Sequence, residues 1–347
     1  MKTQQTIGFA DLAASRRKVK EEFFNQINQI LDWKPIEKLI NSHYQKGESV
    51  TGRPSYEGIV LFKMTLLQTW YGLSDYQVEE QVNDRISFSR FVGISMDGSV
   101  PDNSVISRFR TVLTEAKVYD KLLILINKQL ESHGILVRTG AIVDASITDT
   151  PRRPRGKKEY EAVEDRKETD CEEKPSLQEK IKPHVDKDAR WVKKAGKLRF
   201  GFKQHTAVDR NGLVLGVVTT SANESDMNHL EDILDKIELS EKAWVKADKG
   251  YKSKDNDEVL EKKKLRNHIM FKATKSKALS KREIQFNKGV SRLRYKVERT
   301  FGSTNRWFGA GIARYVGINK MHTQHLMQAI AYNLYCSPGI VMSCCRN

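Results

Sequence analysis

Three carboxylates lie in sequence contexts that suggest a functional site. Asp144 lies inside "AIVDAS", whose small and apolar residues are typical of a buried strand, and Asp248 ends a second strand run in "WVKADKGY". An ionised Asp buried in a sheet is costly unless it is paired or binds a metal. A carboxylate at the carboxyl end of a strand points into the crevice where α/β sheets bind ligands. Taken alone, each is more simply explained as a cap or turn former.

The third carboxylate, Glu298, lies in the basic segment "SRLRYKVERTFG". Between Leu265 and Arg314 there are thirteen Lys and Arg but only two acids. On a helix, four apolar side chains would form a stripe that packs on a sheet: Val290, Leu293, Val297 and Phe301. Glu298 and Arg294, four residues apart, border that stripe. The simpler alternative is an i, i+4 ion pair worth about a few tenths of a kcal/mol.

Considered together, the three acids indicate a metal centre. Carboxylates that converge on one point repel one another, and divalent cations relieve that cost. Ligands that are all oxygen select hard ions, Mg²⁺ or Mn²⁺, over zinc. Two such ions about 4 Å apart clamp the attacking and leaving oxygens of a phosphoryl transfer. The surrounding Arg and Lys would then hold the phosphates of the strand being cut.

The composition fits a polyanionic partner. The 347 residues carry a formal net charge of +16, and an excess of this size favours nucleic acid over a merely soluble basic protein. None of the four cysteines has a metal-ligand spacing. No apolar run approaches the roughly 20 residues of a membrane span, and the first residues lack the apolar core of a signal peptide. We therefore expect a cytoplasmic protein without a membrane partner.

The elements that must position these acids fall into two parts. Residues 1–135 read as helical: one buried helix ends near Gly72, Ser74 and Gln77 are spaced as a capping box, and a helix after Pro101 is amphipathic. This part is either a helix-turn-helix-like module or a plain helical domain. The apolar residues that share a face of the helix after Pro101 are Ile106, Phe109 and Leu113.

From residue 136 onward the pattern predicts strands and helices in alternation. A strand over 141–147 precedes a charged tract at about 150–196, whose first half reads as a flexible excursion. Two strands then flank Asn211-Gly212, a strong hairpin signal, and a helix follows that Ser225 or Asp226 can cap.

Strand, helix, strand and a long helix over about 281–306 complete an α/β fold with a mixed sheet flanked by helices. This is the element order of the ribonuclease-H-like fold. The expected domains are a helical N-terminal domain over 1–135 for binding DNA ends, a ribonuclease-H-like catalytic domain over 136–335, and a tail over 336–347.

These motifs resemble the DDE transposases of bacterial insertion sequences, in the group named after insertion sequence five. "AIVDAS" and "VKADKGY" resemble the two catalytic-Asp motifs, and "RYKVERTFGSTNRWFG" resembles the helix that bears the catalytic Glu. The N-terminal "SYEGIVLFKMTLLQTWYGLSDYQVEEQVNDRISFSRFVG" and the block "DKDARWVKKAGKLRFGFKQHTAVD" also resemble that group. The similarity covers nearly the whole chain.

The resemblance implies that Asp144, Asp248 and Glu298 are catalytic and bind Mg²⁺, or alternatively Mn²⁺. Arg294 and Glu298 fit the signature Y-x2-R-x3-E-x6-K, whereas Ser291 stands where Tyr is common and Asn305 where Lys is common. Arg306 follows immediately as a candidate replacement cation. The residues expected to contact DNA are Arg294, Asn305, Arg306, Lys203 and Lys249. Four further residues lie in matching blocks without an assigned role: Asp186, His205, Asn223 and Asp226.

The resemblance also implies the reaction and its partners. The enzyme would bind the terminal inverted repeats of its element as a homodimer on double-stranded DNA, in the nucleoid-associated cytoplasm. It would hydrolyse phosphodiester bonds at the element ends and join the 3′-hydroxyls to target DNA. Two alternatives stay open: a ribonuclease-H-like DNA nuclease without strand transfer, and a DNA-binding regulator derived from a transposase.

Overall fold

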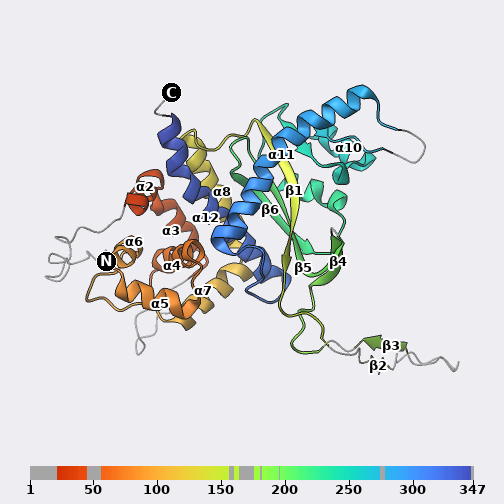
Figure 1. The fold of residues 1–347 in the computed structure, drawn as a ribbon. Helices are drawn as coiled ribbons and strands as arrows, with labels where there is room; N and C mark the ends of the chain where they lie inside the picture. The colour runs from red at the N-terminus through yellow and green to blue at the C-terminus, as the bar shows by residue number, and fades with distance from the viewer. Residues whose placement is uncertain are drawn as a thin grey trace.

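The computed structural model describes residues 22–44, 56–155, 160–163, 176–179, 182–194, 196–273 and 278–344. Figure 1 shows two halves side by side, with the early helices in one half and the sheet, covered by the long helix α11 (Lys281–Phe308), in the other. The mixed sheet flanked by helices and the helical N-terminal region confirm the expected fold class.

The described residues before 136 are helical, as expected, and they include the three helices that the sequence places individually. The early helices are α2 (Glu22–Ile30), α3 (Trp33–Asn41), α4 (Gly58–Tyr71), α5 (Asp75–Asp84), α6 (Ile86–Val92), α7 (Asn103–Glu115) and α8 (Val118–Ser132). Helix α4 ends at Gly72, whose φ of 67° is a left-handed conformation that glycine adopts without strain. The capping box of Ser74 and Gln77 is present at the start of α5. Ile106, Phe109 and Leu113 are buried on one face of α7.

The sheet is built around two neighbouring central strands. Its strands are β1 (Gly140–Asp149), β4 (Arg190–Lys194), β5 (Lys197–Val208), β6 (Val214–Ser221), β7 (Trp244–Ala247) and β8 (Arg266–Ile269). β5 pairs antiparallel with β1, β4 and β6, while β1, β7 and β8 run parallel. The antiparallel hairpin and the parallel crossover strands give the mixed sheet expected from the element order.

Two parts of the sheet region differ from expectation. Strand β4 was not predicted, because its five residues carry three cations and lack a clear apolar alternation. Within the charged tract, β2 (Tyr160–Val163) and β3 (Ser176–Glu179) pair antiparallel as a separate two-stranded sheet. Most of the first half of the tract, where we expected a flexible excursion, lies outside the described residues.

The β5–β6 hairpin turn and four short helices make up the rest of the sheet region. The turn between β5 and β6 contains Asn211-Gly212, and Gly212 takes a φ of 87° there. The short helices are η1 (Asp226–His229), α9 (Leu230–Asp235), η2 (Lys249–Tyr251) and α10 (Lys254–Lys262). Neither Ser225 nor Asp226 caps as expected, because Ser225 stands at the N-cap of η1 without a side-chain hydrogen bond and Asp226 pairs elsewhere.

Strand β5 bends sharply at Gly201. Lys194 pairs with Lys197 at one end of β5, and Ala145 of β1 pairs with His205 further along. In a straight strand the eight residue steps from 197 to 205 would span about 26 Å. The Nζ of Lys194 nevertheless lies 3.4 Å from the carbonyl oxygen of Ala145. The β4–β5 hairpin, residues 190–201, must therefore fold back over β1.

We expect Gly201→Ala to destabilise the fold by about 1–3 kcal/mol, because a methyl group at this bend would overlap its neighbours. The Cβ would lie 2.0 Å from the carbonyl oxygen of Thr148. Chemical denaturation measures the loss. The matched control is Gly289→Ala inside α11, where nothing lies within 4 Å and alanine should stabilise by about 0.5–1 kcal/mol. Equal effects of the two changes would contradict the bend.

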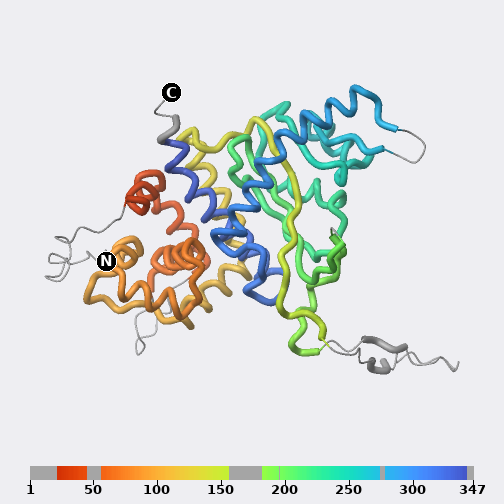
Figure 2. The backbone as a smooth tube through the Cα atoms, in the orientation of Figure 1, coloured from red at the N-terminus to blue at the C-terminus, as the bar shows by residue number. Residues whose placement is uncertain are grey.

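The last helix, α12 (Ile318–Cys344), joins the two halves into one core. It packs against β6 of the sheet and against α8 and α4 of the helical half, and Figure 2 shows it in dark blue running into that half. The indole of Trp70 donates a 2.9 Å hydrogen bond to the carbonyl of Ala331, and Asn333 donates to Asn127 at 2.9 Å. Among the described helices, none combines the length and apolar character that a membrane span requires.

A buried histidine on α12 ties that helix to the sheet. His325 lies between Thr148 of β1, 3.0 Å from its Nε2, and Thr219 of β6, 2.8 Å from its Nδ1. Burial, with the nearby His322 adding a smaller effect, lowers the pKa of His325 to about 3. The ring is therefore neutral at neutral pH in the folded protein.

Acid should destabilise the protein through this histidine. Its folded pKa of about 3 lies below the unfolded value near 6.5, so the unfolded state binds the proton first as the pH falls. The stability present above pH 6.5 is then lost by about 1.4 kcal/mol per pH unit, or about 2 kcal/mol at pH 5. In urea denaturation, His325→Gln should show a pH dependence shallower by that amount. An unchanged slope between pH 7 and 5 would contradict the assignment.

Candidate active site

The three acids come from three different places in the fold: Asp144 from the middle of β1, Asp248 from the residue after β7, and Glu298 from α11. Val143 of β1 pairs in register with Ala247 of the parallel β7. The next residues, Asp144 and Asp248, therefore lie at neighbouring positions. Helix α11 packs across β1, β5 and β7 (Figure 1). Glu298 belongs to this helix. The helix follows from its sequence: Ser280 and Glu283 form a capping box at its start, and Val290 and Val297 are buried beneath it.

The guanidinium of Arg294 lies at the centre of the acids. Its Nη2 is 2.7 Å from Oδ2 of Asp144 and 3.7 Å from Oε1 of Glu298, and its Nη1 is 3.6 Å from Oδ1 of Asp248. The i, i+4 ion pair between Arg294 and Glu298, the simpler alternative for this acid, is present at 3.7 Å, and it is the longest of the three contacts. Only Asp144 lies within hydrogen-bond distance of the guanidinium, and Asp248 and Glu298 make longer contacts of similar length.

The acidic side chains differ in how deeply they are buried. The side chains of Arg294 and Asp144 are 15% and 17% exposed, whereas that of Glu298 is 60% exposed. Burial opposes the charge of Arg294, yet the attraction of the three carboxylates outweighs it and raises the pKa of the guanidinium. The Nε of Arg294 is buried without a hydrogen-bond partner. The charged guanidinium thus balances the acids but is itself incompletely satisfied.

The donor chemistry of this cluster fits a hard divalent cation. Three carboxylates from separate elements converge on one positive charge, and carboxylate oxygens are the ligands that Mg²⁺ and Mn²⁺ prefer. Within the described ranges, however, no group of three or more His, Cys, Asp or Glu side chains is arranged to hold a metal ion directly. The guanidinium takes the place between the acids.

A neutral polar pair lies behind the acids. The hydroxyl of buried Tyr251 is 3.4 Å from Nδ1 of His205. Burial raises the pKa of Tyr251 well above its usual value, and the negative charges of Asp226, Asp144 and Asp248 add to that effect. Burial lowers the pKa of His205 to about 3, with His229 and Lys203 contributing. Neither side chain carries charge at neutral pH, so the pair leaves the charge balance of the cluster unchanged.

The other sequence-predicted residues are dispersed. Lys203 is buried, and its Nζ lies 2.8 Å from Oδ1 of Asp226, so as it stands it faces a carboxylate rather than solvent. Lys249 is exposed directly after Asp248, whose side chain accepts its backbone N–H at 2.6 Å. Ser291, Asn305, Arg306 and Asn223 are exposed.

Asp186 has a structural role that sequence reasoning did not identify. It is 1% exposed, and its carboxylate accepts hydrogen bonds from the backbone N–H groups of Asp188 at 3.1 Å and Gly317 at 3.0 Å. Asp188 in turn accepts from the N–H of Ile318, the first residue of α12. The two acids therefore tie the end of the charged tract to the start of the last helix.

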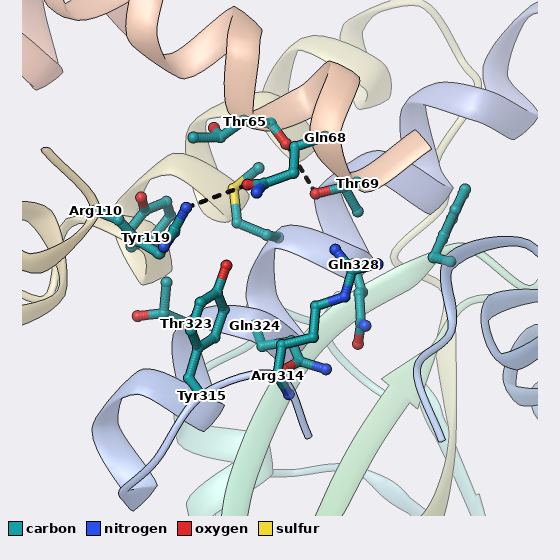
Figure 3. Close-up of a pocket in the computed structure, with 12 residues that line it drawn as sticks. Thr65, Gln68, Thr69, Arg110, Tyr119, Arg314, Tyr315, Thr323, Gln324 and Gln328 are labelled. Carbon is teal, nitrogen blue, oxygen red and sulfur yellow. Dashed lines mark hydrogen bonds between the residues drawn. The ribbon is translucent and has the colours of Figure 1, made fainter. Parts of the chain in front are cut away.

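A small cavity elsewhere in the molecule holds a polar network without the three acids. It has a volume of about 30 Å³ and lies among α4, α7 and α12 (Figure 3). Arg110 donates to Gln68 at 3.2 Å and pairs with Asp75 at 2.5 Å. This ion pair neutralises a buried guanidinium in the helical half, and we assign it a structural role.

The fold and the acidic cluster define the class: a ribonuclease-H-like α/β domain with carboxylates gathered on its sheet. Two family models match the chain, the transposase DDE domain over residues 136–334 and a transposase domain over residues 13–112. The first covers more than half of the chain. This protein therefore belongs to the DDE transposases, a family of divalent-metal-dependent enzymes.

Solved transposase structures show distant similarity. The piggyBac transposase synaptic complex with hairpin DNA is 10% identical, with 94% of this chain and 81% of that chain covered and a TM-score of 0.36. The Mos1 transposase paired-end complex with left transposon end is 9% identical, with 75% and 83% covered and a TM-score of 0.22. The Mos1 strand transfer complex is 9% identical, with 84% and 99% covered and a TM-score of 0.21.

Removing the central guanidinium should destabilise the protein. We expect Arg294→Gln to lower the free energy of unfolding by about 1–3 kcal/mol, because Asp144 would keep a mostly buried charge without its partner. Chemical denaturation at neutral pH measures the change. Arg292→Gln, at an exposed position two residues earlier, should stay within about 0.5 kcal/mol of wild type. If the two variants are equally stable, the central position of Arg294 is wrong.

Proposed function

We propose that Asp144, Asp248 and Glu298 are the catalytic acids of this transposase and hold Mg²⁺, with Mn²⁺ as a substitute. The observation that carries the proposal is their convergence on one cation from three separate elements. Two parallel strands fix the Asp pair, and the packed helix α11 brings Glu298 over them. When bound, the metal ions would supply charge stabilisation for the attacking and leaving oxygens of phosphoryl transfer.

The chain's own residues orient this chemistry. Arg294 balances the acids before a metal arrives, and beside a bound DNA strand its guanidinium suits a phosphate, for which its planar donors are matched. Lys249, Asn305 and Arg306 are exposed on the elements that carry Asp248 and Glu298. We assign these three side chains to backbone contacts with DNA, which fix register without reading sequence. Lys203 joins them only if DNA binding releases it from Asp226.

The substrate we propose is double-stranded DNA carrying the terminal inverted repeats of an insertion sequence of the insertion-sequence-five group. The helical domain over 1–135 would bind the ends, and the catalytic domain over 136–335 would hydrolyse a phosphodiester at each end and join the 3′-hydroxyls to target DNA. Two ends cut together require at least a homodimer on DNA. The net charge of +16 supports a polyanionic partner.

Neutralising one acid should abolish cleavage and leave DNA binding intact. We expect Asp144→Asn and Glu298→Gln each to reduce nicking of a labelled duplex, carrying the repeats that flank this gene, by at least about 100-fold in Mg²⁺. EDTA should reduce wild-type nicking in the same way. Gel shift measures binding in parallel.

Three outcomes of this assay would count against parts of the proposal. Unchanged nicking by the Asn and Gln proteins would contradict the triad. Binding without cleavage under every metal condition would favour a DNA-binding regulator. Cleavage without joining of the 3′ ends to a supercoiled target plasmid would favour a nuclease.

A further inference from the structure

The β4–β5 hairpin, residues 190–201, presents an unneutralised basic surface. From Ala189 to Val208 the sequence holds six cations and no acid. Arg199 is paired with Asp149 at 2.7 Å and Lys203 with Asp226 at 2.8 Å. Arg190 donates to backbone carbonyls. Within the described residues, the three remaining cations are exposed and pair with no carboxylate: Lys193, Lys194 and Lys197.

The hairpin also exposes apolar side chains that elsewhere would be buried. Trp191 is 39% exposed and Leu198 is 63% exposed, and the ring of Trp191 packs against that of Phe200, 5.0 Å away. Lys193 pairs in register with Leu198, so a lysine stands beside these apolar groups on the ribbon. Cations interleaved with an exposed aromatic side chain are typical of surfaces that bind nucleic acid, in which the cations contact the backbone.

The bend at Gly201 brings this surface to the acidic cluster. The hydrogen bond from Lys194 Nζ to the carbonyl of Ala145, at 3.4 Å, places the tip of the hairpin at the residue that follows Asp144. Arg199 anchors the ribbon further back, with Nη2 3.2 Å from the carbonyl of Ile147. Lys194 therefore lies next to Asp144 without pairing with a carboxylate, and Lys197 lies opposite it on the ribbon.

We propose that the β4–β5 hairpin is a DNA clamp: Lys193, Lys194 and Lys197 hold phosphates of the duplex whose strand enters the acidic cluster. This inference rests on the proposed function and adds a surface and a position to it. The contacts are to the backbone, so the hairpin positions the strand and carries no sequence preference. The anchoring of Arg199 on Asp149 fixes the arm, and the lysines at its tip meet the DNA.

The test replaces all three lysines at once, Lys193→Gln/Lys194→Gln/Lys197→Gln, and measures DNA affinity by fluorescence anisotropy across a salt series in EDTA. Each lost phosphate contact should reduce the slope of log K against log salt by about 0.9, so the triple variant should lose about 2 to 3. The matched control is Lys242→Gln/Lys262→Gln/Lys264→Gln, three exposed lysines next to the amino ends of β7 and β8, away from Asp248. It removes the same charge and should change the slope by less than about 1.

A crosslink tests the position independently of any loss of affinity. p-Benzoylphenylalanine at position 194 should attach to nucleotides beside the scissile phosphate, and the same group at position 242 should not. Equal salt slopes for the two triple variants, or crosslinks from position 194 only to distant nucleotides, would overturn the clamp. Wild-type protein that binds and nicks the duplex while the clamp test fails leaves the proposed function standing. Absence of metal-dependent nicking by wild type would instead remove the function itself.

Discussion

The ion cluster around Arg294 constrains the whole catalytic half of the molecule. Three carboxylates in one place repel one another, and without a cation between them the arrangement would be costly. The guanidinium supplies that charge, and it comes from the same helix as Glu298, one turn earlier. The guanidinium can reach all three acids only if α11 crosses β1 and β7 close to Asp144 and Asp248. The register of two parallel strands and the packing of one helix are therefore fixed together.

The rest of the architecture supports that alignment. Val290 and Val297 press α11 onto the sheet, while α12 covers β6 and continues among the early helices. Buried polar groups attach α12 to the sheet region. His325 connects two strands to α12, and Asp186 accepts a hydrogen bond from the residue before that helix. Helical and sheet halves therefore share a hydrophobic core, and movement of one relative to the other would strain the helix that bears their contacts.

Positive charge is paired with carboxylates inside the molecule and left unpaired on parts of its surface. Buried cations such as Arg110, Lys203 and Arg294 each face a carboxylate, as the cost of burying a charge requires. The uncompensated positive charge stands on the surface, on the hairpin beside Asp144 and along the exposed side of α11. A protein that balances its interior charges and leaves surface cations free next to an acidic cluster is suited to a polyanion that approaches that cluster.

The sequence by itself determined most of the element types and singled out the three acids. A capping box, a hairpin turn and apolar periodicity are local signals, and they predicted α5, the β5–β6 hairpin and α11 correctly because neighbouring residues decide them. Asp144, Asp248 and Glu298 stood out for the same reason, since each interrupts a local pattern.

Only the tertiary structure decided what surrounds those residues. The pairing of Lys203 with Asp226, the guanidinium between the acids, and the fold-back of β4 at Gly201 all join positions far apart in the chain. No local pattern encodes such contacts, because they depend on which strands become neighbours and on where a strand can bend. The same reason explains why β4 was missed: its residues are polar, and it is a strand because β5 pairs with it.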